Sequence, residues 1–205
     1  MLKVGLTGGY ASGKSFVASR LEQFGCHVVY ADKLGHQVLE PEGEAYRPTV
    51  EMFGAGILTP ERRIDRKKLG ATVFGDPELL RILNGIVHPA VFRLEEQELF
   101  DWGAQHPYGI AVIEAAILIE TGRYAAFDRL IVTACTQETQ IRRGMQRDGL
   151  SHQQTLVRIE RQLPLEEKKR HAHYVIDTDG TEDQVVQQVN EIFNDLKRLA
   201  EAGKP

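Results

Sequence analysis

The stretch Gly8-Gly9-Tyr10-Ala11-Ser12-Gly13-Lys14-Ser15 follows the pattern G-x-x-x-x-G-K-[ST] of a loop that binds nucleotide phosphates. Its glycines let the backbone fold so that several N–H groups point at phosphate oxygens, and the helix expected after it adds the positive end of its dipole. In such loops the lysine, here Lys14, reaches the β- and γ-phosphates, and the hydroxyl of Ser15 joins the coordination shell of Mg²⁺. We therefore predict that the nucleotide is bound by Gly8, Gly9, Ala11, Ser12, Gly13, Lys14, Ser15 and Phe16.

The segments on either side of this loop predict a parallel sheet. The apolar run at residues 2–7 has the length of a strand, apolar residues at helical spacing follow as far as Gly25, and residues 26–31 form a second strand-like run. Strand, helix and strand in this order make a βαβ unit. Later strand-like runs lie at residues 109–114, 129–134 and 174–177, and an amphipathic helix is expected over about 182–200. We predict an α/β fold of the P-loop NTPase type, with a five-stranded parallel sheet flanked by helices.

The spacing between the predicted strands indicates two additional parts. Residues 32–107 are mostly helical in pattern, with one helix expected after Asp76-Pro77 and a separate one after His88-Pro89. Residues 141–170 contain eight basic and four acidic residues, which is typical of either a solvated helical face or a lid over phosphates. The predicted division is a nucleotide-binding core at 1–31, 108–135 and 172–205, a helical substrate lobe at 32–107 and a helical lid at 136–171.

Composition limits the function classes. The chain has 205 residues, 42% hydrophobic residues and a formal net charge of −4, which excludes collagen and wholly disordered proteins and argues against binding nucleic acid or an anionic membrane over its whole surface. Only two cysteines occur, so a disulfide framework is not expected and a reducing compartment fits. No apolar run approaches the ~20 residues of a membrane-spanning helix. We therefore expect a cytoplasmic protein, and the sequence makes no prediction of its oligomeric state.

Several polar residues outside the loop are candidates for catalysis. Asp32 directly follows the second predicted strand, at the edge where the phosphate loop opens, so its carboxylate can orient an attacking hydroxyl and accept its proton, or it can cap the next helix. Arg143 and Arg147 share one helical face, where they can neutralise charge on a transferred phosphoryl group or serve only as surface residues. Glu114 is a candidate to bind Mg²⁺ through a water molecule or to cap a helix, and His88 has either a structural or a site role.

The class of phosphate-loop protein is narrowed by what the sequence lacks. A GTPase switch would need the base-reading tetrapeptide N-K-x-D, which does not occur. A small-molecule kinase needs an ATP cradle, a substrate lobe, a base and an arginine lid, and the chain offers a candidate for each. A kinase acting on a nucleoside, a nucleotide or a sugar acid, and a nucleotide-dependent switch, remain the alternatives.

The ordered set of motifs along the chain resembles the dephospho-CoA kinase family. Besides the phosphate loop, the resemblance rests on Ala31-Asp32, Arg66 and Leu69, Leu83-Asn84, His88-Pro89, Ile117-Leu118-Ile119-Glu120, Gln140, Arg143, Gln146-Arg147-Asp148, Arg158-Ile159, Gln162-Leu163-Pro164 and Tyr174-Val175-Ile176-Asp177. It implies phosphorylation of the ribose 3′-hydroxyl of dephospho-CoA by ATP with Mg²⁺. It also implies that Asp32 is the base, that Asp32, Arg66 and His88 bind this substrate, and that Arg143 and Arg147 are lid residues that contact ATP or the transferred group.

The chain departs from the family pattern within the loop itself. The family usually has Ile-Gly where this chain has Tyr10-Ala11, and Thr where it has Phe16. A further departure is His173, where the family has Asp. None of these changes alters Lys14 or Ser15, so we expect the activity to survive.

Overall fold

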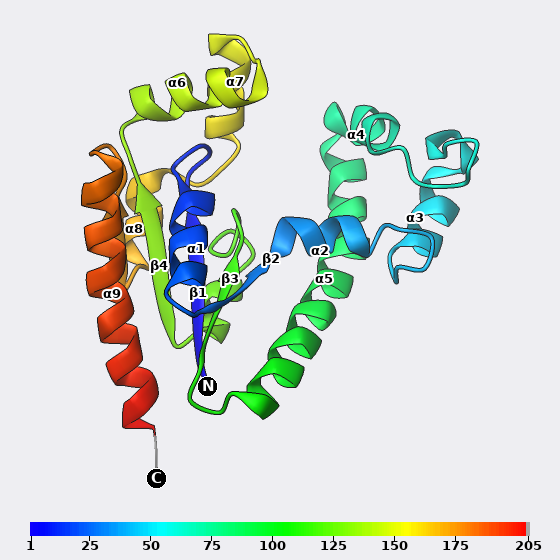
Figure 1. Ribbon diagram of the computed structural model, residues 1–205. Helices are drawn as coiled ribbons and strands as arrows, with labels where there is room; N and C mark the ends of the chain where they lie inside the picture. Colours follow the sequence, from blue (N-terminus) through cyan, green and yellow to red (C-terminus); the bar gives the residue numbers. More distant parts are fainter. Residues whose placement is uncertain (204–205) are drawn as a thin grey trace. The chain divides into compact units, whose positions relative to one another are not determined.

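The computed structural model of this protein describes residues 1–203, which form alternating strands and helices (Figure 1). In chain order the elements are β1 (Leu2–Gly8), α1 (Lys14–Gln23), β2 (His27–Tyr30), α2 (Ala31–Gln37), α3 (Tyr46–Phe53), the 3₁₀ helix η1 (Ala55–Ile57), α4 (Arg66–Phe74), α5 (Pro77–Gln105), β3 (Ile110–Glu114), the 3₁₀ helix η2 (Arg123–Ala126), β4 (Arg129–Ala134), α6 (Gln137–Asp148), α7 (His152–Glu160), α8 (Leu165–Arg170), β5 (Tyr174–Asp177) and α9 (Glu182–Ala202). Each of the five predicted strands is confirmed to within one residue at either end.

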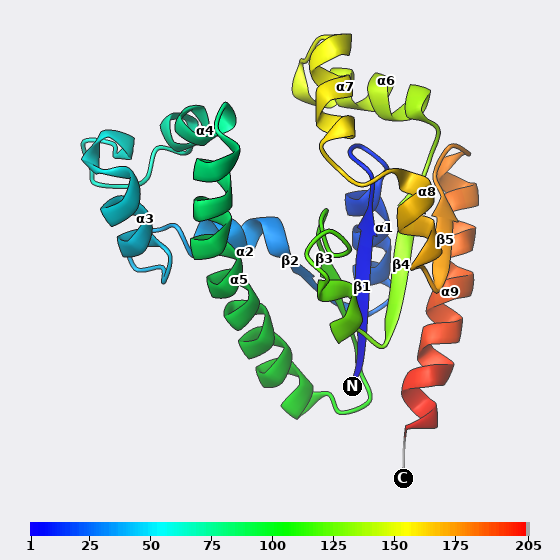
Figure 2. The same cartoon turned by 180° about the vertical axis from the view of Figure 1, so that it is seen from behind.

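The strands form one parallel sheet in the order β2-β3-β1-β4-β5. Helices α1 and α9 cover one face of this sheet, and α8 lies on the other face (Figures 1 and 2). All five residues of β3 are buried, as expected for a central strand with both faces covered. The predicted α/β fold with a five-stranded parallel sheet is therefore confirmed.

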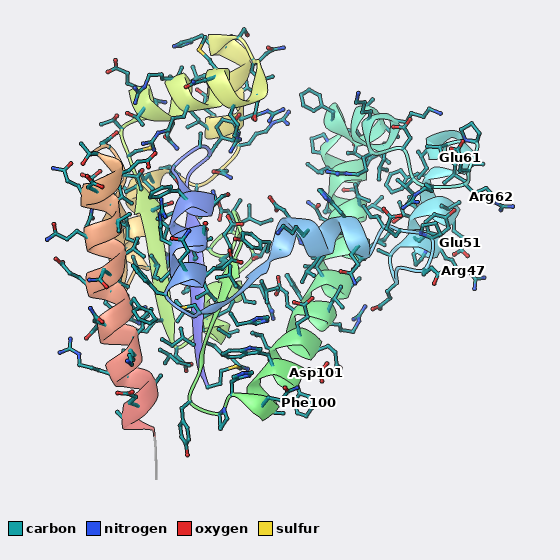
Figure 3. All side chains as sticks on the ribbon, in the orientation of Figure 1. Arg47, Glu51, Glu61, Arg62, Phe100 and Asp101 are labelled. Atoms are coloured by element: carbon teal, nitrogen blue, oxygen red, sulfur yellow. The ribbon has the colours of Figure 1, made fainter. Side chains whose placement is uncertain are left out.

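The chain divides into two compact units, one containing Met1–Val29 and the chain from Trp102 onward, the other Tyr30–Asp101. The second unit is helical and has a small core of Ile57, Leu69 and Val73, packed against Leu39, Phe53, Leu58, Ile64, Leu79 and Leu83. Its surface is rich in charge, with Arg47 and Glu51 on α3 and Glu61 and Arg62 on the loop after η1 (Figure 3). The assignment of residues 32–107 to substrate and 136–171 to a lid remains a prediction.

The expectation of two separate helices around His88-Pro89 is wrong. A single helix, α5, runs through this sequence with Pro89 inside it. Proline removes one backbone hydrogen bond and crowds the carbonyl four residues earlier, at a cost of about 3 kcal/mol. Helix α5 continues because Ala90, Val91 and Leu99 beyond the proline are buried, and it changes direction along its length (Figures 1 and 2). Within residues 1–203, no helix combines the length and apolar character needed to cross a membrane.

Candidate active site

The predicted phosphate loop connects the end of β1 to the first residue of α1. Gly13 is the N-cap of α1 and adopts the left-handed conformation, with φ at 85°. Glycine has no side chain that could accept from the first N–H groups of the helix, and a helix start without a side-chain cap suits an anion. Ala11 is also left-handed, with φ at 53°, which is unusual for a residue that has a Cβ. The backbone conformation at Ala11 therefore favours glycine.

The loop is held in place by buried contacts with β4 and α6. The Ser12 hydroxyl donates to the Gly9 carbonyl at 2.8 Å and lies 2.7 Å from the hydroxyl of Thr133 on β4. A Cβ at Gly8 would collide with Thr133, and one at Gly9 would collide with the side-chain amide of Gln140 on α6. Gly8 is therefore required by the close approach of the β4 backbone, whereas a side chain at Gly9 would force the amide of Gln140 to move.

Lys14 folds back over the loop from the first turn of α1. Its ammonium donates to the Gly9 carbonyl at 3.1 Å and lies 3.5 Å from the Gly8 carbonyl. Ser15 follows it and is exposed, so its hydroxyl is accessible. The backbone N–H of Phe16, which we predicted to face phosphate, donates here to the Gly13 carbonyl at 3.1 Å, and its role in nucleotide binding stays a prediction.

Arg143 reaches the phosphate loop through Thr178, which follows β5. The Arg143 guanidinium donates to the Thr178 hydroxyl at 3.0 Å and to its carbonyl at 2.6 Å. The Thr178 hydroxyl lies 3.0 Å from the Ser12 carbonyl, to which it donates. Thr178 was not identified in the sequence analysis. It lies in a D-x-x-G pattern that ends at Gly180, but this pattern is too common to indicate a site.

Arg147 has different partners, although it lies one turn further along α6. Its guanidinium donates to the Asp148 carboxylate at 2.8 and 3.0 Å, and Arg158 of α7 donates to the same carboxylate at 3.0 Å. The hydroxyl of Tyr10, from the phosphate loop, also donates to Asp148. Hydrogen bonds from Arg147 and Tyr10 lower the pKa of Asp148 to about 2. Two arginines and the tip of the loop therefore share one ionised carboxylate.

A second residue that sequence reasoning did not identify is Lys168 of α8, whose side chain is fully buried. Its ammonium donates to the Glu120 carboxylate and to the Ala116 carbonyl, and it lies 3.5 Å from the Gly8 carbonyl at the start of the phosphate loop. Glu120 also accepts from the backbone N–H of Leu163. These contacts connect α8, the segment after β3 and the phosphate loop.

Glu114 is the last residue of β3 and is buried, with 6% of its surface exposed. It lies opposite Leu6 in the parallel register, two residues before β1 ends in the phosphate loop. Within residues 1–203, no three His, Cys, Asp or Glu side chains gather closely enough to hold a metal ion on their own. A Mg²⁺ ion at this edge would therefore take phosphate and water oxygens in addition to protein ligands.

The three residues predicted to bind the acceptor belong to the unit Tyr30–Asp101. Asp32 is exposed in the first turn of α2, whose N-cap is Tyr30, so the alternative that Asp32 caps this helix is wrong. Arg66 begins α4 and is exposed. His88 is half-buried on α5, and this burial lowers its pKa, so at neutral pH it can offer a neutral N–H to a ligand but no positive charge.

Comparison with known proteins supports the family resemblance that the motifs indicate. A model of the dephospho-CoA kinase family matches residues 2–184. The chain is 41% identical over 190 residues to the dephospho-CoA kinase of Geobacter sulfurreducens, covering 93% of this chain and 96% of the relative. It is 39% identical over 197 residues to a dephospho-CoA kinase domain-containing protein of Danio rerio, with coverage of 96% and 86%.

Two solved structures show the same fold. The crystal structure of TT1252 from Thermus thermophilus superposes with a TM-score of 0.82 at 31% identity, over 95% of this chain and 97% of that one. A dephospho-CoA kinase from Campylobacter jejuni superposes with a TM-score of 0.65 at 23% identity, over 96% and 97%. The family match spans the phosphate loop, Arg143 and Arg147 of α6 and the helical unit, and the chain therefore belongs to the dephospho-CoA kinase family.

Proposed function

We propose that this protein transfers the γ-phosphoryl group of ATP to the ribose 3′-hydroxyl of dephospho-CoA, which yields coenzyme A and ADP. The observation that carries the proposal is the phosphate loop at Gly8–Ser15 within a chain whose residues 2–184 match the dephospho-CoA kinase family. This loop provides the site for a triphosphate donor. The family match supports the choice of acceptor over nucleosides and sugar acids.

The loop binds the triphosphate of ATP with backbone donors and with Lys14. In the structure the Lys14 ammonium contacts the carbonyls of Gly8 and Gly9, which are dipolar acceptors without a full charge. A phosphate oxygen carries a full charge and accepts a stronger hydrogen bond than a carbonyl does. We therefore expect the ammonium to exchange these carbonyls for the β- and γ-phosphates when ATP binds.

The oxygen groups at this edge fit a Mg²⁺ ion. Mg²⁺ prefers oxygen ligands and usually keeps several waters, so one hydroxyl from Ser15 together with phosphate oxygens is a suitable set. The carboxylate of Glu114, at the end of the neighbouring strand, would accept a hydrogen bond from a water bound to this ion. When bound, the ion would neutralise charge on the phosphates.

Asp32 acts as the base in this proposal. Its exposed carboxylate orients the 3′-hydroxyl toward the γ-phosphate and accepts its proton as the new P–O bond forms and the bond from the γ-phosphorus to the bridging oxygen of ADP breaks. Arg66 and His88 hold the acceptor, and Arg143 and Arg147 neutralise the charge on the transferred group. Residues 136–171 act as a lid that excludes water, which limits hydrolysis of ATP.

The proposal is tested with a panel of acceptors. Purified protein is incubated with ATP, Mg²⁺ and either dephospho-CoA, a nucleoside, a nucleotide or a sugar acid, and ADP release is followed. We expect kcat/KM for dephospho-CoA to exceed that for the other acceptors by at least about a hundredfold, because a site built for specific polar contacts rejects analogues that lack them. A preferred acceptor of another class would contradict the proposal.

A further inference from the structure

We propose that Tyr10 is a positioning residue, which holds Arg147 and Arg158 beside the phosphate loop by binding their shared partner Asp148. The inference rests on the proposed role of Arg147 in phosphoryl transfer. It assigns a function to a side chain that the mechanism above does not use.

The first argument is that α6 is shaped to receive the Tyr10 ring. A Cβ at Gly144 would lie 2.5 Å from a ring carbon of Tyr10, so a side chain larger than that of glycine would displace the ring. One turn earlier, the side-chain amide of Gln140 donates to the Tyr10 carbonyl at 2.7 Å. Tyr10 is therefore held by α6 at both its backbone and its ring.

The second argument is the distribution of charge around the ring. The Arg147 and Arg158 guanidiniums lie 5.1 and 5.8 Å from the centre of the Tyr10 ring, a distance at which cations are attracted to aromatic faces. Both arginines also donate to Asp148, which accepts from the Tyr10 hydroxyl as well. Burial raises the pKa of Tyr10, so its hydroxyl stays protonated and remains a donor at neutral pH.

The consequence is a preformed positive site next to the loop. Two guanidiniums and one carboxylate leave an excess of one positive charge beside the residues that bind the triphosphate. Free arginine side chains lose rotamer entropy when a ligand orders them, which weakens binding. The Tyr10–Asp148 contact orders Arg147 before the nucleotide arrives. The rotamer entropy of Arg147 is therefore lost when the protein folds, and nucleotide binding loses no further entropy at this side chain.

A double-mutant cycle on kcat/KM for ATP tests the inference. The four proteins are the wild type, Tyr10→Phe, Arg147→Ala and the double variant. Tyr10→Phe keeps the ring and removes only the hydroxyl, and we expect it to lower kcat/KM about five- to tenfold, within the range for the loss of one typical intramolecular hydrogen bond. In the Arg147→Ala background, the same change should alter kcat/KM less than about twofold, because the residue that Tyr10 positions is absent.

Tyr174→Phe is the matched control. The Tyr174 hydroxyl donates to Asp195, which also pairs with Arg198, so this variant loses the same kind of bond at the start of β5, away from the phosphate loop. We expect wild-type kcat/KM from it, and a change in melting temperature similar to that of Tyr10→Phe. A merely structural Tyr10 would lower stability without the coupling to Arg147.

Two results would overturn the inference, and they differ from each other. If Tyr10→Phe lowers kcat/KM by the same factor with and without Arg147, or does not lower it at all, Tyr10 does not act through Arg147, although the arginine keeps its proposed role. If Arg147→Ala alone leaves kcat/KM unchanged, the proposed role of Arg147 fails, and the inference fails with it.

Discussion

The ammonium of Lys168 donates to the carboxylate of Glu120 at 2.7 Å, and no part of the Lys168 side chain is exposed to solvent. Burial lowers the pKa of Lys168, and the hydrogen bond that its ammonium donates to Glu120 opposes this effect. The same ammonium donates to the Ala116 carbonyl at 2.8 Å. The Lys168 ammonium is shielded from water, so Glu120 and the Ala116 carbonyl, both in the segment after β3, replace water as its hydrogen-bond partners.

Removing either member of this pair should destabilise the protein strongly. We expect Glu120→Gln and Lys168→Met each to lower the free energy of unfolding by about 3 kcal/mol, because each leaves charged or polar groups without their partner. Urea unfolding measures this. Lys169→Met is the matched control, since Lys169 pairs with Glu166 at the surface, and its effect should stay below about 1 kcal/mol. Equal effects of Lys168→Met and Lys169→Met would contradict the prediction.

Asp32→Asn should abolish most of the phosphoryl transfer. The amide can occupy the same space but cannot accept the proton of the hydroxyl, so we expect kcat to fall by about 10²–10⁴-fold. The affinity for ATP, measured by calorimetry, should change less than about twofold, because the phosphate loop is intact. Glu78→Gln, which alters another exposed acid in the first turn of a helix, should leave kcat unchanged. Near-normal turnover of Asp32→Asn would show that Asp32 is not the base.

Ala11→Gly should stabilise the protein, although glycine usually destabilises. A residue with a Cβ in the left-handed region is strained by about 1–2 kcal/mol, and glycine relieves this strain. Glycine also raises the conformational entropy of the unfolded chain, which offsets part of the stabilisation. We expect a net increase of about 0.5–1 kcal/mol in the free energy of unfolding. Ala71→Gly, inside α4, should show the opposite sign. The idea is wrong if both variants lose stability.

The stability contributed by Asp148 should disappear in acid. Its pKa of about 2 in the folded protein lies below its ordinary value of 3.8, so the unfolded chain takes up a proton first as the pH falls. The folded state therefore loses stability between about pH 4 and pH 2. We expect the wild type to melt above Asp148→Asn at pH 7, and this difference to shrink through that window. A difference that is the same at pH 6 and pH 2.5 would refute the role of the ionised carboxylate.

Local patterns predicted the parts of the molecule that depend on local sequence. Short apolar runs such as residues 129–134 identified the strands, because buried parallel strands have no polar face. The phosphate loop could be predicted because its glycines and Lys14 have the fixed spacing of the G-x-x-x-x-G-K-[ST] pattern. The bend of α5 was mistaken for a break, because the sequence shows Pro89 but not the buried residues that keep the helix packed beyond it.

The contacts that complete the site were not predictable in this way, since they join distant parts of the chain. Lys168 and Gly8 lie 160 residues apart, and in the sequence Lys168 looks the same as its partly exposed neighbour Lys169. Tyr10 and Asp148 are separated by 138 residues. Each of these pairs exists only because the parallel sheet brings β1, β4 and the helices beside them together.

The most direct measurement is the fate of the γ-phosphate. Protein is incubated with γ-labelled ATP, Mg²⁺ and dephospho-CoA, and the labelled product is mapped by selective phosphatase digestion and phosphorus NMR. We predict label on the ribose 3′-hydroxyl of newly formed coenzyme A, and none with Lys14→Met, which loses the ammonium that binds the transferred group. Label on another hydroxyl, or release of labelled phosphate without transfer, would contradict the proposed reaction.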